Sequence, residues 1–175
     1  MSVADETILA GISLRPLEPC DMDFLARLYA TTRAEEMALL SHWSHVEKAA
    51  FLDSQFKAQH DHYQMHYAGA RFDIVTRDGL DIGRFYVYPM EQELRLMDIT
   101  LLPELRGRGI GGALLRALQA EAEAAGKMIS LYVEEQNPAR RLYERHGFEE
   151  AGEASFYKLM TWRPKGAATA ATTAS

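Results

Sequence analysis

Between residues 99 and 112, an apolar, strand-like segment runs into a loop of arginine and glycine that opens an amphipathic helix. The loop reads Arg106-Gly107-Arg108-Gly109-Ile110-Gly111-Gly112. Glycine lets a backbone turn tightly and approach a ligand, and the first turn of a helix presents unpaired N–H groups at the positive end of its dipole. Arg106 and Arg108 add charge-assisted donors. The segment therefore predicts a phosphate-type anion site where a strand meets a helix.

Other interpretations of this loop are less consistent with the sequence. A plain turn with solubilising arginines would not need four glycines within six residues, which destabilise a helix start. Gly107, Gly109 and Gly112 also satisfy the dinucleotide pattern G-x-G-x-x-G, with Glu134 lying 22 residues beyond. Three features disfavour that fold. Two arginines flank the position where backbone would approach the pyrophosphate, and more than a hundred residues precede the motif, which leaves too little chain for the rest of a doubly wound sheet. Two predicted helices and a hairpin also come before it. A Walker-type loop is excluded because no Lys-Ser or Lys-Thr follows the glycines.

The apolar period places further elements around this segment. Alternation and helical spacing, with their turn and capping signals, predict a β-α-α-β-β-β-α-β-α-β order. Ser44 and Glu47 form a capping-box signature, Asp21 is a candidate N-cap, and Arg77-Asp78-Gly79 is a hairpin turn. The predicted strands are 12–17, 72–75, 82–89, 93–102, 128–133 and 156–162, and the predicted helices start near 21, 44, 109 and 138. This order predicts one mixed sheet with helices on its faces, in a single domain over 1–165 and a disordered Ala/Thr-rich tail over 166–175.

Composition bounds the class of protein. The chain has 175 residues, of which 47% are hydrophobic and 25% charged, as in an ordinary globular domain. A single cysteine, Cys20, is typical of a protein in a reducing compartment. The first residues carry Asp5 and Glu6, whereas a secretory signal begins with basic residues. A cytoplasmic location is therefore expected. A net charge of −6 disfavours nucleic-acid and anionic-membrane partners and is compatible with a cationic substrate such as an amine.

The strand before the loop carries an irregularity. Leu94 and Leu96 alternate, but the next core-like pair is Ile99 and Leu101, so the pattern slips by one near Met97 and Asp98. A slip of this kind predicts a β-bulge, which commonly re-aims side chains or frees backbone beside a site.

Two motifs in order resemble the GNAT family of N-acetyltransferases. Arg106-x-x-Gly109-x-Gly111, preceded by Ile99-Thr100-Leu101-Leu102-Pro103-Glu104, looks like the family's acyl-CoA motif, and the run from Asn137 to Phe148 resembles its second signature. The resemblance covers about 12–162 and is strongest over 93–148. It implies the GNAT acyl-CoA N-acyltransferase fold, an α+β fold with a mixed, largely antiparallel sheet and helices on both faces. Some relatives carry an extra residue between the Asn and the Tyr, so the roles of that pair depend on a helix starting at Pro138.

The resemblance implies acetyl-CoA as co-substrate, no metal, and direct attack of an amine on a thioester. Tyr143 matches the family's proton donor to the departing thiolate, although a core tyrosine is the plain alternative. Asn137 would face the cofactor arm, cap the short helix, or do both. The backbone from Ile99 to Leu101 would pair with the pantetheine arm. Residues implied to bind the cofactor are Ile99, Leu101, Arg106, Gly107, Arg108, Gly109, Ile110, Gly111, Gly112, Asn137 and Tyr143.

Carboxylates on the bulged strand are candidates for the base that removes the ammonium proton. Glu93, Arg95 and Asp98 would face one cleft, and Asp98 or Glu93 would act directly or through water. Surface carboxylates are equally common on strands without such a role.

Five of the six histidines lie between His42 and His66. His62 and His66 are four residues apart, but no acidic third ligand at a recognisable spacing accompanies them. We therefore interpret these histidines as the polar face of a helix or as part of an acceptor pocket rather than as a metal site. In the family this region shapes acceptor specificity, which makes Trp43, Tyr63 and Tyr67 candidates there.

The sequence thus predicts transfer of an acetyl group from acetyl-CoA to a primary amine, on a small molecule or a protein. A homodimer is compatible with the family. The alternatives are a CoA-binding module without catalysis, a dinucleotide-binding oxidoreductase, and an interaction protein whose glycine loop binds neither CoA nor NAD.

Overall fold

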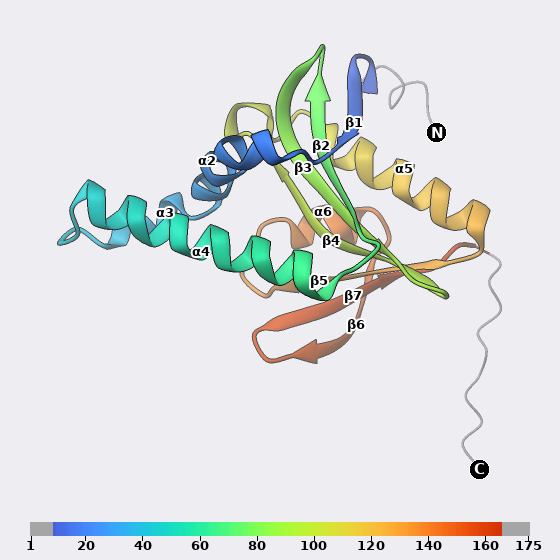
Figure 1. Ribbon diagram of the computed structural model, residues 1–175. Coiled ribbons are helices and arrows are strands. Elements are labelled where there is room, and N and C mark those ends of the chain that lie inside the picture. The colour runs from blue at the N-terminus through green and yellow to red at the C-terminus, as the bar shows by residue number, and fades with distance from the viewer. Residues whose placement is uncertain (1–8, 166–175) are drawn as a thin grey trace.

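A computed structural model describes residues 9–165 of the chain (Figure 1). The strands are β1 (Ile12–Pro16), β2 (Arg71–Arg77), β3 (Leu80–Pro89), β4 (Glu93–Leu101), β5 (Met128–Glu134), β6 (Glu149–Ala154) and β7 (Tyr157–Trp162). The α-helices are α2 (Met22–Thr32), α3 (Ala34–Leu39), α4 (His45–His66), α5 (Ile110–Ala125) and α6 (Arg140–Arg145). Two short 3₁₀ turns, η1 (Pro19–Asp21) and η2 (Pro103–Leu105), precede α2 and the arginine/glycine loop. The predicted tail over 166–175 lies outside the described residues.

The described strands form one seven-stranded sheet in the order β1-β2-β3-β4-β5-β7-β6. Every neighbouring pair is antiparallel except β4 and β5, which run parallel with α5 as the crossover between them. The prediction of a mixed, largely antiparallel sheet is therefore confirmed. The sequence did not predict β6, an edge strand with mostly exposed residues.

The hairpin between β2 and β3 turns where the sequence predicted. Asp78 and Gly79 both have positive φ, at 51° and 81°. Two consecutive residues of positive φ make a turn whose twist matches that of the flanking strands, and Asp-Gly is a favoured pair for it.

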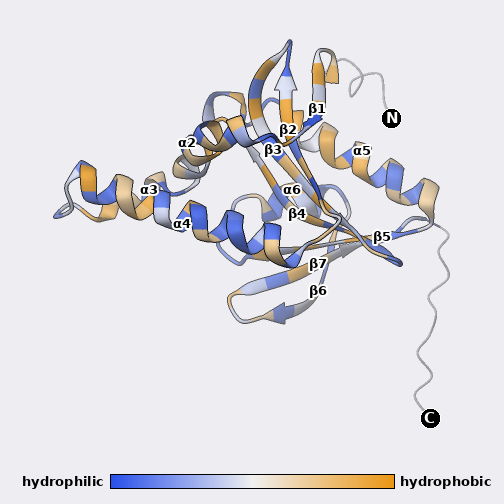
Figure 2. Cartoon of the chain, viewed as in Figure 1, coloured by the Kyte–Doolittle hydropathy of each residue, from blue (hydrophilic) through white to orange (hydrophobic). Residues whose placement is uncertain are grey.

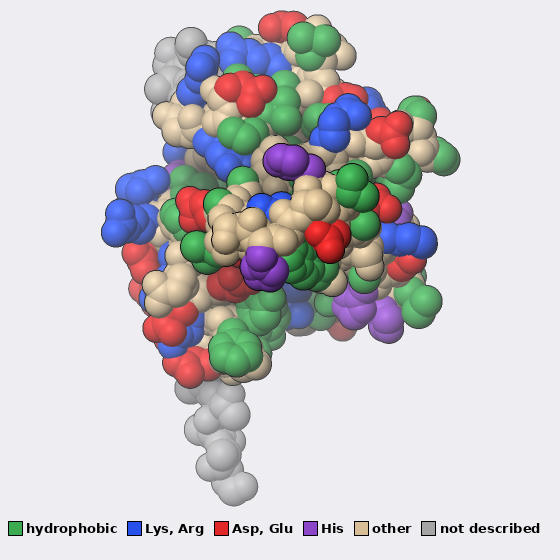
Figure 3. All heavy atoms as spheres, turned by 90° about the vertical axis from the view of Figure 1, so that its left-hand side faces the viewer, with side chains coloured by type: hydrophobic (Ala, Val, Ile, Leu, Met, Phe, Trp, Pro, Cys, Tyr) green, Lys and Arg blue, Asp and Glu red, His purple; other side chains and the backbone are tan. Residues whose placement is uncertain are grey.

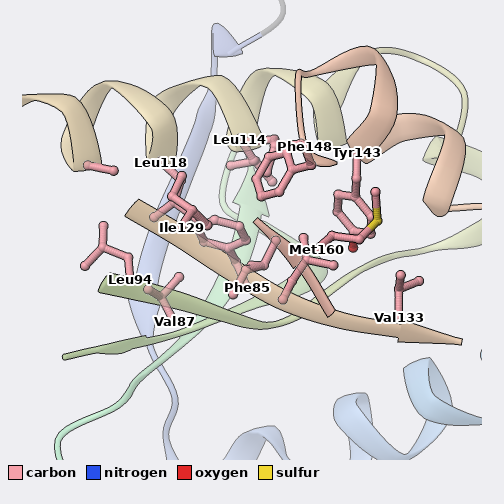
Figure 4. Close-up of a cluster of buried hydrophobic side chains, with 14 of the residues drawn as sticks. Phe85, Val87, Leu94, Leu114, Leu118, Ile129, Val133, Tyr143, Phe148 and Met160 are labelled. Atoms are coloured by element: carbon pink, nitrogen blue, oxygen red, sulfur yellow. The ribbon is translucent and has the colours of Figure 1, made fainter. Parts of the chain in front are cut away.

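Two apolar clusters hold helices on opposite faces of the sheet. On one face, α5 and α6 cover residues that include Leu94, Leu96 and Ile129, and Figure 4 shows part of this cluster. On the other face, Leu25 and Leu28 of α2, Phe56 of α4 and Ile74 of β2 pack together. Figure 2 shows that the second half of α4 is mostly hydrophilic, in keeping with Phe56 as the buried residue of that helix.

The helix starts agree with the sequence to different degrees. Ser44 and Glu47 form the predicted capping box: the Ser44 hydroxyl accepts from the Glu47 N–H, and the Glu47 carboxylate accepts from the Ser44 N–H. Asp21 holds the N-cap position of α2, but the prediction that its side chain caps the helix is wrong. That carboxylate is 4% exposed and instead accepts two hydrogen bonds from Arg15 and one from the Glu18 N–H. Within residues 9–165, none of the helices is long and apolar enough to cross a membrane.

Candidate active site

The predicted bulge lies on β4. Tyr86 of β3 is opposite Asp98, and the next residue, Val87, is opposite Leu96, so Met97 is the extra residue of β4. The bulge keeps Leu94 and Leu96 in the α5 core before it and Leu101 in the same core after it. The slip in period seen in the sequence is therefore confirmed as a structural feature.

The sheet opens next to this bulge. The parallel pairing joins Glu93–Leu96 to Met128–Leu131 and stops there. Beyond that point β4 pairs with β3, and β5 pairs with β7. The β5-facing backbone edge of 97–101 is therefore left without a partner strand, which makes a V-shaped splay between β4 and β5. The backbone from Ile99 to Leu101, which is predicted to contact the cofactor, lies along this edge.

The arginine/glycine loop brings the start of α5 to the wide end of the splay. Gly107 and Gly109 adopt positive φ, at 70° and 82°, a conformation that costs other residues free energy. Gly109 is the N-cap of α5, and its carbonyl accepts the N–H of Ala113, so the first helical N–H groups point into the loop. The arrangement is that of an anion site at a helix N-terminus.

The two arginines of the loop differ in their surroundings. Arg106 donates from Nε to the Leu101 carbonyl at 2.9 Å and from Nη2 to the Thr31 hydroxyl at 2.9 Å. It therefore ties the loop to the end of β4 and to α2, a structural role that the sequence did not predict. Arg108 is exposed, and we expect its guanidinium to provide more of the charge for an anion.

Tyr143 lies in α6 and points from the helix toward the sheet (Figure 4). It is 7% exposed, and its ring centroid lies 5.8 Å from that of Phe148. Burial raises the pKa of Tyr143, and the negative charge of Asp98 raises it further. The phenol is therefore held in its protonated form, as a proton donor requires.

The predicted start of the short helix at Pro138 is wrong by two residues. The helix α6 begins at Arg140, and Pro138 and Ala139 form a tighter turn in which Arg140 N–H donates to the Asn137 carbonyl. The Asn137 side chain accepts from the Ala139 N–H at 2.9 Å, which caps this turn. The chain still winds helically from Asn137 to Tyr143, so the spacing of this pair is kept.

The three charged candidates on β4 divide into two networks. Glu93 accepts from Arg95 at 2.7 Å and from the Ser130 hydroxyl at 3.0 Å, before the bulge. Asp98, after the bulge, accepts from Arg84 at 2.7 Å and from the Thr100 hydroxyl at 2.7 Å. The structure therefore brings Glu93 and Arg95 together and places Asp98 with different partners.

Arg84 was not singled out from the sequence. It is 3% exposed, stacks over the ring of Tyr86 at 5.2 Å, and also donates to Gln59 of α4 at 2.9 Å. Its Nε and the Tyr86 hydroxyl are buried without a hydrogen-bond partner. Burial raises the pKa of Tyr86 to about 12, against the opposing effect of the Arg84 charge. The sequence did offer a signal for this pair: Arg84 is a charged residue inside an apolar strand, and the next strand carries the acidic residue Asp98.

The candidates for the acceptor pocket are also divided. Tyr63 packs edge-on against Tyr86 and Tyr67 against Tyr88, with centroids 6.1 and 5.4 Å apart. Trp43 instead contacts Phe51, which lies in the first half of α4, about 18 Å from Tyr63 along the helix axis.

The histidines of α4 and its flanks lie apart from other potential metal ligands among the described residues. No group of three or more potential metal ligands occurs among residues 9–165. Figure 3 shows histidine side chains at separate places on the face that it presents. A surface cavity of about 320 Å³ lies elsewhere, lined by Pro16, Leu17, Gln64 and residues 70–73. It contains none of the predicted catalytic or cofactor-binding residues.

Comparisons with known proteins agree with this geometry. A family model described as an acetyltransferase (GNAT) domain matches residues 68–150, which span the bulge, the loop and Tyr143. A Bacillus subtilis (strain 168) protein provisionally named ribosomal protein bS18 alanine N-acetyltransferase is 25% identical over 125 residues, which cover 70% of this chain and 83% of that protein.

Solved structures share the fold. The PaiA N-acetyltransferase of Thermoplasma acidophilum, in complex with coenzyme A, has a TM-score of 0.66 at 18% identity and covers 87% of this chain and 98% of that one. The spermidine N-acetyltransferase of Vibrio cholerae, in complex with CoA and spermine, has a TM-score of 0.59 at 22% identity, with coverages of 88% and 96%. The chain therefore belongs to the GNAT family and is an acetyl-CoA-dependent N-acetyltransferase.

Proposed function

We propose that this acetyltransferase acetylates a primary amine at the splay between β4 and β5, with the carbonyl of the thioester near the bulge. The observation that carries the proposal is the end of the parallel pairing after Leu96 and Leu131, which leaves the β5-facing backbone edge of 97–101 without a partner strand. Acetyl-CoA supplies an activated acetyl group and a thiol leaving group. The remaining work falls to residues of the chain: holding the cofactor, polarising a carbonyl, and moving two protons.

The residues of the loop fit the phosphate end of the cofactor. A β-carbon on Gly107 would meet no atom within 4 Å, so its positive φ reflects the path of the backbone. The N–H groups from Ile110 to Gly112 and the Arg108 guanidinium offer donors to phosphate oxygens. The free backbone edge from Ile99 to Leu101 offers donors and acceptors to the amide-rich arm, and one N–H there would stabilise a developing oxyanion. Asn137 borders the same region.

Tyr143 is the proposed general acid. Its phenol is buried and protonated, and it lies on the α6 side of the splay, where a departing thiolate would need a proton. No hydrogen bond joins its hydroxyl to another residue among those described, 9–165. The hydroxyl can therefore turn toward a sulfur atom without breaking an existing contact.

Asp98 and Glu93 remain the candidates for the base, acting through water. Each carboxylate already accepts two side-chain hydrogen bonds, so direct contact with an ammonium group would have to displace one of them. Asp98 is the better placed of the two, because it lies at the bulge and acts electrostatically on Tyr143.

The proposed acceptor is a small cationic amine or a protein amine. The net charge of −6 favours approach of a cation. The relatives point to two kinds of acceptor: one is named for an alanine of a ribosomal protein, and one structural neighbour holds spermine.

Thiol release from acetyl-CoA with a panel of amines tests the proposal, with polyamines, amino-terminal alanine peptides and aminoglycosides as its arms. We expect one class to give saturable release, and Tyr143→Phe to lower kcat by about 10²-fold or more at every pH. Full activity of Tyr143→Phe on that substrate would overturn the general-acid role. Tight CoA binding without release for any amine would indicate a binding module, and a preference for NAD would indicate an oxidoreductase.

A further inference from the structure

The C-terminal end of α6 is attached to α5 through His146. The ring Nδ1 lies 2.7 Å from the Leu142 carbonyl oxygen, one turn earlier, and Nε2 lies 2.8 Å from Arg116 Nη1 on α5. Gln119 of α5 donates from its side-chain amide to the His146 carbonyl at 2.7 Å. The His146 backbone N–H in turn donates to the Tyr143 carbonyl at 2.9 Å. One residue thus connects α5 with the turn that carries Tyr143.

The partners fix the protonation state of this ring. A carbonyl oxygen only accepts hydrogen bonds, and a guanidinium only donates them. Nδ1 must therefore carry the proton, and Nε2 must present its lone pair to Arg116. A second proton on Nε2 would set N–H against N–H and bring two cations together.

Gly112, at the start of α5, makes room for this contact. A β-carbon on Gly112 would lie 3.2 Å from His146 Nε2 and 3.3 Å from its Cε1, closer than side chains usually pack. A β-carbon on Gly111 would lie 3.7 Å from the Leu142 side chain. Gly112 therefore permits close docking of α6, Gly111 leaves room for a β-carbon at ordinary contact distance, and Gly107 and Gly109 shape the anion loop.

We propose that His146 is a positioning residue whose neutral ring, held between the Leu142 carbonyl and Arg116, fixes Tyr143 relative to the helix that opens at the anion loop. The proposal rests on the proposed role of Tyr143, because His146 acts through that residue. Its consequence is that proton transfer depends on the charge of a group outside the site.

Charged side chains near the ring come from α5 and from α6 itself. From α5 the ring faces the Arg116 guanidinium, which also has another interaction partner. On α6 itself, Glu144 and Arg145 are exposed and directly precede His146 in sequence. From β7 the uncharged indole of Trp162 lies beside the glycine that follows the ring. Arg116 is thus the charged group that a second proton on His146 would meet.

A measurement of the tautomer tests the contact without using activity. In a ¹⁵N-histidine-labelled protein, we expect the His146 ring at pH 7.5 to show a protonated Nδ1 and an unprotonated Nε2, the signals being assigned by their loss in His146→Gln. An Nε2–H tautomer, or a charged ring at this pH, would overturn the proposal even if Tyr143 proves to be the acid. If Tyr143→Phe is fully active, the general-acid role fails while the tautomer still reports on the contact.

Rate measurements test the positioning. Because a second proton on Nε2 would oppose the Arg116 guanidinium, the wild-type kcat at saturating acetyl-CoA is expected to fall at acid pH. His146→Gln, which is neutral and can accept from Arg116, should keep most of the rate at pH 7.5 and lose this acid limb. His146→Ala should lower kcat by about tenfold at pH 7.5, since a small misplacement of a catalytic group is costly, with a smaller change in KM for acetyl-CoA.

Two further variants complete the series. Arg116→Gln can accept as well as donate, so it tolerates both charge states of the ring and should also flatten the acid limb. Arg145→Gln removes an exposed positive charge one residue away and should keep the wild-type profile. If wild type and His146→Gln share the same acid limb, His146 does not position Tyr143 and the proposal fails.

Discussion

Arg84 is a cation enclosed by the sheet and α4, and its charge is balanced by Asp98, which is 14% exposed. Removing one partner of such a pair leaves an uncompensated buried charge, which costs about 3–5 kcal/mol, whereas replacing both by apolar groups is often neutral. This asymmetry separates a structural role of Asp98 from a catalytic one.

Asp98→Ala alone is therefore expected to lower the free energy of unfolding by about 3–5 kcal/mol in urea titrations, and Arg84→Met with Asp98→Ala to recover most of it. If Asp98 is the base, the folded double variant stays slow and loses the dependence of kcat/KM on pH that the wild type shows. If the double variant recovers the wild-type rate, Asp98 is not the base, and Glu93→Ala becomes the next variant to measure.

A second pair predicts how stability depends on pH. The Arg15 hydrogen bonds lower the pKa of Asp21 below its usual range, against the opposing effect of burial. Because the folded-state pKa is lowered, the stabilisation is complete above about pH 4 and is lost as pH falls through the folded-state value. Asp21→Asn should cost about 1–3 kcal/mol at pH 7, and the difference from wild type should shrink by pH 3. An equal difference at both pH values would contradict this assignment.

The hydrogen bonds of a side chain could be predicted from the sequence where its partner lies a few residues away along the chain. Ser44 and Glu47 satisfy each other within one helical turn, so the capping box follows from spacing alone. Asp21 has the same kind of side chain, but its partner Arg15 approaches from β1, and that competing contact determines where the carboxylate points. Arg84 likewise depends on Asp98 and Gln59, which sequence spacing does not bring together.

At the scale of elements, the glycines of α5 make a matched pair of substitutions. Gly111→Ala places a β-carbon at ordinary contact distance and should raise Tm by roughly 2 °C through the lower entropy of the unfolded chain. Gly112→Ala places one against the His146 ring and should lower Tm relative to Gly111→Ala. Thermal unfolding without CoA measures both. Equal Tm values would show that the His146 ring moves aside at no cost in stability, so that the α5–α6 contact is not tightly packed.

The elements that were missed have weak patterns. In β6, three glutamates, two alanines and a glycine leave no apolar alternation, and pairing with β7 alone makes it a strand. In α3, Met37 is the buried residue, too little for a helical period to show. The bulge on β4 was predictable because both sides of it are buried in one core, so that a slip of one residue is visible as a change of period.

For the whole molecule, the splay predicts that the cofactor stabilises the fold. CoA at about 100 times its Kd should add about 2.7 kcal/mol, which corresponds to a rise in Tm on the order of 5–10 °C for a domain of this size. Differential scanning fluorimetry with CoA, and with NAD as the control ligand, measures the shift. Arg108→Ala should reduce the shift with CoA, and a larger shift with NAD would count against the assignment of the loop to CoA.

The order of strands was beyond sequence reasoning. Predicting that β7 lies between β5 and β6 requires knowledge of which distant residues pair, and their alternation patterns are alike. The helices on both faces followed more readily, because each amphipathic helix needs an apolar sheet face to cover.

The short parallel seam between β4 and β5 also bears on turnover. Four residue pairs join strands β1–β4 to strands β5–β7, which makes this seam, where the cofactor arm would lie, the shortest pairing of the described sheet. We expect the two groups of strands to move relative to each other at this seam, on the microsecond-to-millisecond scale, and so to admit a long, flexible ligand. Release of the product CoA would then limit the turnover rate. A variant with a stronger β4–β5 pairing would turn over more slowly, while its fold would be more stable.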